Sequence, residues 1–262
     1  MIPKILHFVY MGGLPFSFVH WMAMQSAVVL NRPEKVYVHC SGEPSGPYWD
    51  RIRPVVTLMP TKPVTRVFDR RVSKIPHQAD VVRLRALLEF GGIYLDIDTI
   101  SVQPLTDLLS YPCVLGVEGE PDDPQIRRGL GNAVILAEPH APLIERWYKN
   151  YANFDDTAWD FHSTTVPSEL ADRFPDEVHI EPYDRFYYPL YTSEGIQSMF
   201  ASVSSFPSAL VHHLWQLATW KKHLKQLDDA RVKQVDSTYN LIARRFLDAD
   251  PLQAMASAES AG

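Results

Sequence analysis

The sequence predicts an α/β fold, in which a mostly parallel central sheet is covered by helices on both faces. Short apolar runs typical of buried strands alternate along the chain with longer segments whose apolar residues recur at helical spacing. Several of these runs are nearly continuous, as in strands that are covered on both faces. The chain has 262 residues, of which 46% are hydrophobic and 21% charged. It can therefore bury a sizeable core.

The first elements alternate between strand and helix. Strands are expected at 3–10, 35–40 and 55–59, where apolar runs are bounded by turn residues and prolines. Pro15 is expected to open a helix that continues to about Asn31, because proline suits the first helical position. Ligands in α/β sheets bind beyond the carboxyl ends of strands, so the end of the first strand, at Val9 and Tyr10, is a natural nucleotide site.

Residues 77–100 carry the densest pattern. The segment 78–90 has apolar residues at helical spacing, and Gly91 and Gly92 follow at once. Glycine accepts positive φ, so the helix is expected to end there. A brief apolar strand at 93–95 then leads into Asp96-Ile97-Asp98. Side chains alternate along an extended chain, so both carboxylates are expected on one side and Ile97 in the core.

The two neighbouring carboxylates, Asp96 and Asp98, predict a divalent cation, which removes their mutual repulsion. Oxygen ligands suit Mg²⁺ and Mn²⁺, which also bind diphosphate oxygens. Asp80 and Arg83 share a face of the preceding helix. A helix that runs back along the strand would bring them to the same pocket. An Asp-x-Asp alone is also typical of a solvated turn, so the prediction depends on the whole block.

The remainder continues the α/β pattern. A short segment follows Pro104, strands are expected at 113–117 and 133–137, and a Pro- and Asp-rich loop joins them at 118–128. A helix is expected at 142–151, loop at 153–174, strands at 178–180 and 209–215, a final helix at 239–249 and a flexible tail at 251–262. The strand at 209–215 places His212 and His213 on opposite faces. At most one of them should therefore reach the metal.

The segment ADVVRLRALLEFGGIYLDIDT resembles the signature block of the DXD-containing sugar transferases of glycosyltransferase family 32, relatives of the large clostridial glucosylating toxins. The opening IPKILHFVYMGGLP, the internal segment NAVILAEPHAP and the late His213-Leu214-Trp215 extend the resemblance more sparsely. It implies a GT-A fold, in which a Rossmann-like sheet carries a short antiparallel addition. It also implies a nucleotide-sugar donor, a Mn²⁺ or Mg²⁺ ion and transfer with retention of anomeric configuration.

The resemblance assigns roles to nine residues. The expected metal ligands are Asp96, Asp98 and His213, and the expected catalytic residues are Asp80, Arg83, Asp96 and Asp98. The expected donor-binding residues are Val9, Tyr10, Asp80, Arg83, Tyr94, Asp96 and Asn132. Arg83 would support the charge on the departing diphosphate, and Asp80 would accept hydrogen bonds from sugar hydroxyls.

The expected function is metal-dependent transfer of a hexose from a nucleoside diphosphate sugar to a hydroxyl of a saccharide or glycolipid. A UDP-sugar is favoured as donor, with GDP-mannose as the alternative. Two other classes stay open: a glycoside hydrolase with paired carboxylates, and a noncatalytic module that binds sugar or a divalent ion. The expected organisation is a single GT-A domain at 1–250, with a nucleotide-sugar half at about 1–118 and an acceptor half at about 119–250.

The composition of the chain limits which partners it can bind and in which compartment it is expected. The net charge of −6 gives no sign of a general nucleic-acid binder. Two cysteines are consistent with a reducing compartment. The sequence contains no apolar run of membrane-helix length and no recognisable signal peptide, so a cytoplasmic location is predicted. The basic stretch 60–76 is interpreted as a solvent-exposed surface, and a peripheral contact with an acidic membrane stays open.

Overall fold

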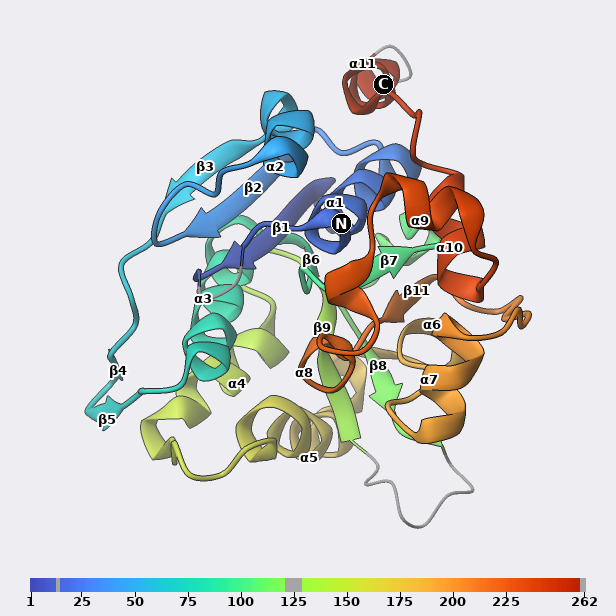
Figure 1. The fold of residues 1–262 in the computed structure, drawn as a ribbon. Helices are drawn as coiled ribbons and strands as arrows, with labels where there is room; N and C mark the ends of the chain where they lie inside the picture. Colours follow the sequence, from blue (N-terminus) through green and yellow to red (C-terminus); the bar gives the residue numbers. More distant parts are fainter. Residues whose placement is uncertain (13–14, 121–128, 260–262) are drawn as a thin grey trace.

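A seven-stranded sheet forms the centre of the molecule in a computed structural model that describes residues 1–12, 15–120 and 129–259 (Figure 1). The strand order is β10-β8-β9-β6-β1-β2-β3. Strand β9 runs antiparallel to both of its neighbours, and the other pairings are parallel. The strands are β1 (Ile5–Tyr10), β2 (Lys35–Cys40), β3 (Thr57–Pro60), β6 (Gly92–Leu95), β8 (Cys113–Glu118), β9 (Gly129–Ala137) and β10 (His179–Glu181). The predicted mostly parallel sheet is confirmed.

Helices cover both faces of the sheet because consecutive strand side chains point to opposite sides. Phe8 joins a core cluster with Trp21 and Met22 of α1, whereas Val9 joins a second cluster with Val81 of α3. The larger helices are α1 (Phe18–Asn31), α3 (Ile75–Phe90), α4 (Pro142–Asn150), α5 (Val166–Arg173), α7 (Ser193–Phe200) and α11 (Pro251–Glu259). The shorter ones are α2 (Pro47–Ile52), α6 (Tyr183–Phe186), α8 (Gln216–Thr219), α9 (Asp229–Gln234) and α10 (Thr238–Arg244). No helix in the described part of the chain is long and apolar enough to cross a membrane.

Two small antiparallel sheets accompany the central one. Strand β7 (Thr99–Ser101) pairs with β11 (Val211–His213), which joins residues more than a hundred positions apart in the chain. This pair is the short antiparallel addition that was expected, although β7 itself was not predicted as a strand. Strands β4 (Arg66–Val67) and β5 (Arg70–Arg71) form a hairpin.

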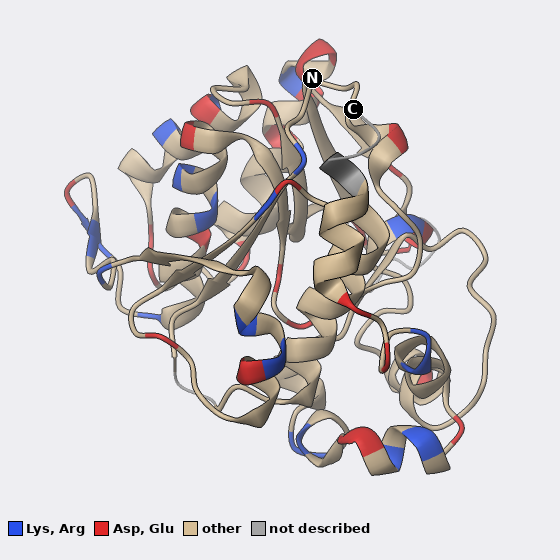
Figure 2. Ribbon diagram, turned by 90° about the horizontal axis from the view of Figure 1, so that it is seen from above, with Lys and Arg blue, Asp and Glu red and all other residues tan. Residues whose placement is uncertain are grey.

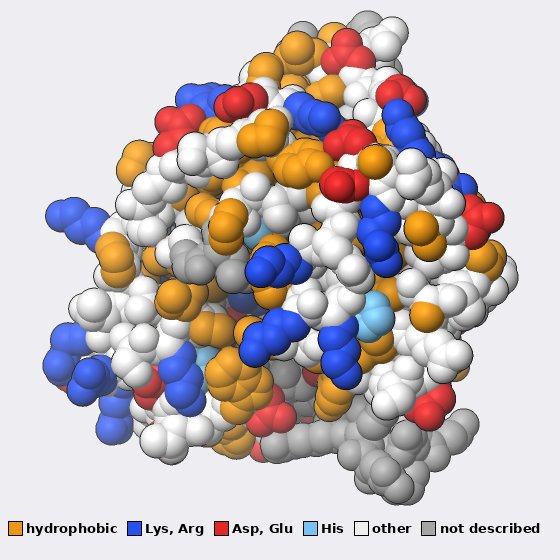
Figure 3. Space-filling model, in the orientation of Figure 1, with side chains coloured by type: hydrophobic (Ala, Val, Ile, Leu, Met, Phe, Trp, Pro, Cys, Tyr) orange, Lys and Arg blue, Asp and Glu red, His pale blue; other side chains and the backbone are white. Residues whose placement is uncertain are grey.

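The β4–β5 hairpin carries much of the predicted basic stretch. It projects from the body of the molecule, and its arginines are grouped there (Figures 2 and 3). Phe68, at its tip, is 50% exposed and has a φ of +47°. Arg70 donates from Nε to the carbonyl oxygen of Ala152 at 2.9 Å, which ties the hairpin to the segment after α4.

The ends of the two long helices follow their capping residues. Helix α1 begins at Phe18 rather than Pro15, since Ser17 is extended and its backbone N–H donates to Nδ1 of His20 at 3.1 Å. Helix α3 begins at Ile75, three residues earlier than predicted. Its last residue is Phe90, and Gly91 caps it with a φ of +61°, the positive value that favoured glycine there.

The bounds of several helices and strands differ from the predicted ones, because contacts with distant parts of the chain determine them. Strand β9 begins at Gly129, four residues before the predicted start, so Asn132 lies within the strand. A Cβ on Gly131 would lie 2.4 Å from the Tyr187 ring, so this glycine serves close packing. Helix α5 and a π-helical turn at Phe161–Thr165 occupy part of the predicted loop 153–174. Helix α11 replaces most of the expected tail and contacts α1. Residues 13, 121–128 and 260–262 of the predicted loops and tail lie outside the described residues.

Candidate metal and donor site

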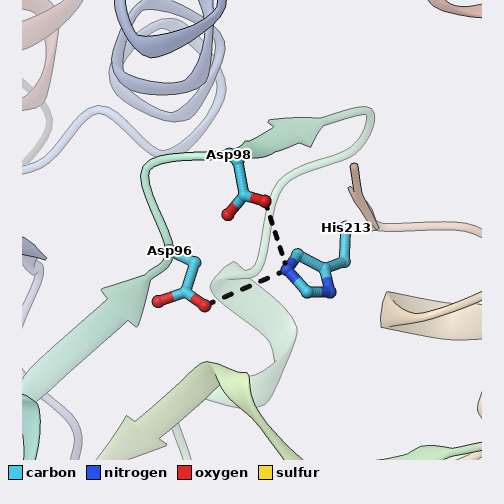
Figure 4. Close-up of side chains that lie close together, drawn as sticks. All are labelled: Asp96, Asp98 and His213. Carbon is cyan, nitrogen blue, oxygen red and sulfur yellow. Dashed lines mark ion pairs between the residues drawn. The ribbon is translucent and has the colours of Figure 1, made fainter. Parts of the chain in front are cut away.

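Three predicted ligands converge at the carboxyl end of the central sheet (Figure 4). Asp96 follows β6, Asp98 lies in the turn before β7, and His213 ends β11. The Nε2 atom of His213 lies 3.5 Å from Oδ2 of Asp98 and 4.0 Å from Oδ2 of Asp96. One ligand atom from each residue lies within 4.8 Å of the others. Two carboxylates and an imidazole are a donor set that fits Mn²⁺ or Mg²⁺.

The Asp96-Ile97-Asp98 motif is a turn and not the extended chain that the alternation argument assumed. Thr99 Oγ1 donates to the Asp96 carbonyl oxygen at 2.8 Å, which closes the turn. Ile97 packs against the core, as expected. The carboxylates still converge, because β7 pairs with β11 and so brings His213 opposite Thr99.

The segment after β11 holds Asp98 in place. The backbone N–H of Gln216 donates to Oδ2 of Asp98 at 2.7 Å, and that of Leu214 donates to the Asp98 carbonyl at 2.8 Å. Trp215, between them, has a left-handed φ of +54°. A bulky residue in this conformation carries strain of about 1–3 kcal/mol, a cost that is typical of functional sites.

His20 supports this segment from α1, and the sequence reasoning missed it. Its Nδ1 accepts the Ser17 N–H, so its Nε2–H donates to Oε1 of Gln216 at 3.1 Å. Burial lowers the pKa of His20, which keeps the ring neutral. No sequence signal could have marked His20, since it contacts a residue 196 positions away.

Arg83 is the centre of a buried network. Its Nη2 lies 3.1 Å from Oδ1 of Asp80 and 3.2 Å from Oδ1 of Asp96, and its Nη1 donates to the Asn132 carbonyl at 2.6 Å. The guanidinium also lies 4.6 Å from the centre of the Tyr94 ring, whose hydroxyl donates to Asp96. The predicted approach of α3 to the aspartates is therefore observed. Arg83 is only 4% exposed, and each of these partners is a protein group.

Asp80 also belongs to this network and is 6% exposed. Its Oδ1 accepts a hydrogen bond from Nδ2 of Asn132 at 2.7 Å. Burial raises the pKa of Asp80, while Arg83 and Asn132 oppose that rise. Asp80 and Asn132 thus form a hydrogen-bonded polar pair beside Asp96.

The ligand cluster itself is strongly charged. Burial opposes ionisation of Asp98, but His213 and the Gln216 N–H together lower the pKa of Asp98. Burial alone would lower the pKa of His213, yet Asp98, Asp96 and Glu118 together raise it. The three acids thus favour the protonated imidazole, an effect that a bound cation would oppose.

Glu118 is a second residue that sequence reasoning missed, since it was assigned to a loop. It ends β8, where burial raises the pKa of its carboxyl and the charge of His213 opposes that rise. Its position in the chain, at the carboxyl end of a strand, is the signal that could have found it.

The remaining residues that the sequence singled out differ in how far they are buried. Tyr10 ends β1 half-buried, edge-on to Phe16 with ring centres 5.9 Å apart. The side chain of Val9 is buried in the core, and its expected part in donor binding stays a prediction. His212 is 1% exposed and donates from Nδ1 to the Tyr188 carbonyl at 2.9 Å. His213 alone of the two histidines reaches the acids.

Comparison with known proteins gives matches along most of the chain. A family described as "Glycosyltransferase sugar-binding region containing DXD motif" matches residues 19–115. "Glucan organizing enzyme 1" of Cryptococcus neoformans var. grubii is 32% identical over 264 residues, which cover 94% of this chain and 71% of that protein. An uncharacterized protein of Arabidopsis thaliana is 27% identical over 176 residues, covering 58% of this chain and 26% of that protein.

Solved structures share the fold. The apo form of the glycosyltransferase GlyE from Streptococcus pneumoniae TIGR4 superposes with a TM-score of 0.53 at 14% identity, covering 98% of this chain and 63% of that one. An active-site mutant of LgtC gives a TM-score of 0.52 at 13% identity, covering 94% of this chain and 97% of that one. At such low identity the likeness concerns the fold alone.

Proposed function

This chain belongs to the glycosyltransferases whose sugar-binding region contains a DXD motif, and on that premise we propose a specific reaction for it. The enzyme moves one hexose from a nucleoside diphosphate sugar to a hydroxyl of a saccharide or glycolipid acceptor, with retention of anomeric configuration. The observation that carries the proposal is the convergence of Asp96, Asp98 and His213 on one point. Two acids and an imidazole at that spacing suit a dication that also binds diphosphate.

Asp98, Asp96 and His213 would hold the ion. When bound, Mn²⁺ or Mg²⁺ would neutralise the charge that grows on the departing diphosphate. The Gln216 N–H and His20 keep Asp98 oriented toward that point. Asp96 has both Arg83 and the Tyr94 hydroxyl on its Oδ1, which leaves Oδ2 toward the ion.

We add a positioning role to the one expected of Arg83, which was to support the charge on the departing diphosphate. Because its guanidinium is shared among Asp80, Asp96 and the Asn132 carbonyl, it acts as a positioning residue for Asp96. Asp80, paired with Asn132, is the group we assign to accept hydrogen bonds from donor-sugar hydroxyls. Tyr10 is the group we assign to the nucleotide base.

The donor and the acceptor are proposed on separate grounds. A UDP-sugar is our first choice as donor and GDP-mannose the second. The name of the fungal relative refers to glucan, which favours a glucose polymer as acceptor. For a glycolipid acceptor, the β4–β5 hairpin is the surface that would approach an acidic membrane (Figure 2).

A panel of nucleotide sugars with Mn²⁺, read out by released nucleotide, tests the proposal. We expect turnover of one donor that stops on addition of EDTA and returns with excess Mn²⁺. Asp98→Asn should abolish it, whereas the same change at exposed Asp107 should not. No turnover of any nucleotide sugar would overturn the proposal. Metal-independent cleavage of glycosides would favour a hydrolase instead, although the two acids are close for separate acid and base roles.

A further inference from the structure

A cavity of about 510 Å³ opens beside α7, and none of Asp96, Asp98 and His213 lines it. This volume lies within the range of about 300–1,000 Å³ that is typical of ligand pockets. Its lining residues come from α7 and the segments around it: Glu120, Tyr188, Leu190, Thr192, Glu194, Gly195, Ser198, Ser204 and Phe206. The reaction proposed above uses none of them.

Strand β11 separates this cavity from the acids. His213 faces Asp96 and Asp98, whereas His212 points to the opposite side of the strand. There His212 donates to the Tyr188 carbonyl at 2.9 Å, and its ring lies edge-on to Phe206 at 5.3 Å. Tyr188 and Phe206 both line the cavity, so it lies behind β11 as seen from the acids. Helix α6 packs on β11 at the same place (Figure 1).

The charge of the lining selects a class of ligand. Two carboxylates, Glu120 and Glu194, line the cavity, and no Lys, Arg or His is among the described lining residues. A nucleotide or another anion would be repelled. Neutral hydroxyl groups, in contrast, donate readily to carboxylates.

The aromatic and hydroxyl groups complete the features of a sugar site. The Tyr188 and Phe206 rings stand at 76° with centres 5.6 Å apart, which gives an apolar corner for the C–H face of a pyranose. Thr192 Oγ1 accepts the Gly195 N–H at 3.1 Å, so its own hydroxyl hydrogen can donate to a ligand. Ser198 Oγ donates to the Gly195 carbonyl at 2.8 Å and keeps its lone pairs for a ligand hydroxyl.

The wall of the cavity is tightly packed. A Cβ on Gly195 would lie 2.1 Å from the Leu190 carbonyl oxygen, so the first turn of α7 packs directly on the chain at Leu190. Thr192 caps that helix. The cavity is therefore preformed, which reduces the entropic cost of holding a ligand.

We propose that this cavity is a second saccharide-binding site, which holds one neutral sugar unit of a glycan chain. Its role rests on the proposed function: the cavity would bind a sugar unit of the acceptor chain other than the one whose hydroxyl reacts. Binding energy from such remote units of a substrate supports reaction at the distant centre. A transferase with this site prefers an oligosaccharide acceptor over a monosaccharide.

Binding of neutral tetrasaccharides to the full chain tests the proposal without catalysis. Maltotetraose, laminaritetraose and cellotetraose would be titrated by ligand-observed NMR, with EDTA present and no nucleotide. We expect at least one to bind, and Tyr188→Ala to weaken that binding by roughly tenfold or more. Glu194→Gln, at an exposed position that should not affect folding, is expected to weaken it several-fold. Trp159→Ala is the matched control, because this aromatic is 53% exposed and does not line the cavity.

Two results would overturn the proposal. One is no binding of any of the three tetrasaccharides at about 5 mM. The other is binding that Glu194→Gln leaves unchanged, or that Trp159→Ala weakens as much as Tyr188→Ala. Donor turnover with Mn²⁺ separates the two proposals. Turnover without tetrasaccharide binding removes only the second site, and binding without turnover of any donor removes only the proposed reaction.

Discussion

Arg83→Met tests the network that positions Asp96. The change removes a guanidinium that lies 3.1 Å from Asp80 and 3.2 Å from Asp96 and donates to the Asn132 carbonyl at 2.6 Å. Removing one partner of a buried ion pair costs about 3–5 kcal/mol, because the other charge stays buried without compensation. This is a large part of the roughly 5–15 kcal/mol that stabilises a typical domain.

The free energy of unfolding, from urea denaturation at pH 7, measures this cost. We expect a loss of about 3–5 kcal/mol and a fall in Tm of about 6–20 °C. Arg83→Lys should recover only part of it, since one ammonium cannot bridge both acids and the carbonyl. In the double variant with Asp80→Asn, the loss should be smaller than the sum of the single losses, because the uncompensated charge is then removed.

Arg85→Met is the matched control, because Arg85 lies two residues further along the same helix and is exposed to solvent. Arg85 is exposed and donates to the Tyr148 hydroxyl at 2.9 Å. Its loss should cost less than about 1 kcal/mol. An Arg83→Met loss no larger than that of Arg85→Met would refute the reasoning, and so would additive losses in the double variant.

Two further predictions concern the sheet beneath the site. Burial lowers the pKa of His7 from 6.5 to about 3 and that of His39 to about 4, so the folded protein binds fewer protons than the unfolded chain in this range. The free energy of unfolding should therefore fall as pH drops below about 6.5, by about 1.4 kcal/mol per pH unit for each histidine. Urea denaturation at pH 7 and pH 5 measures this fall, which should be smaller in His39→Gln and unchanged in His140→Gln, a change at an exposed position. A fall in His39→Gln as large as in the wild type would show that the assignment is wrong. Gly92→Ala should be strongly destabilising, because φ is +109° and the new Cβ would lie 2.5 Å from a carbonyl oxygen of β1. Gly42→Ala is the control and should be nearly neutral, since no atom of the described residues lies within 4 Å of its new Cβ. Equal shifts in Tm for the two variants would contradict this.

The parts of the fold that local patterns encode were predictable. The strand Lys35–Cys40 was predicted at its observed bounds, and the end of α3 at Gly91 follows from a positive φ that glycine accepts. The pairing of β7 with β11 was not, because three-residue strands carry almost no local signal. The start of β9 also escaped prediction, since Gly131 is in the strand to make room for Tyr187.

The candidate site shows the same division. Asp80, Arg83 and Asp96 could be grouped from the sequence because they lie in one helix-strand block, and the structure brings them within contact. The alternation of side chains in β11 correctly separated His213 from His212. Helical spacing could not reveal that His20 supports Asp98 through Gln216, because that contact depends on how α1 meets a segment far along the chain.

Binding of Mn²⁺ to the metal-free protein, followed by electron paramagnetic resonance, tests the central claim most directly. The wild-type chain should bind a single ion, and more tightly when UDP is present. Asp98→Asn should weaken the affinity by about tenfold or more, whereas Asp107→Asn should leave it unchanged. An unchanged Mn²⁺ affinity in Asp98→Asn would contradict the assignment of these acids and His213 to a metal site.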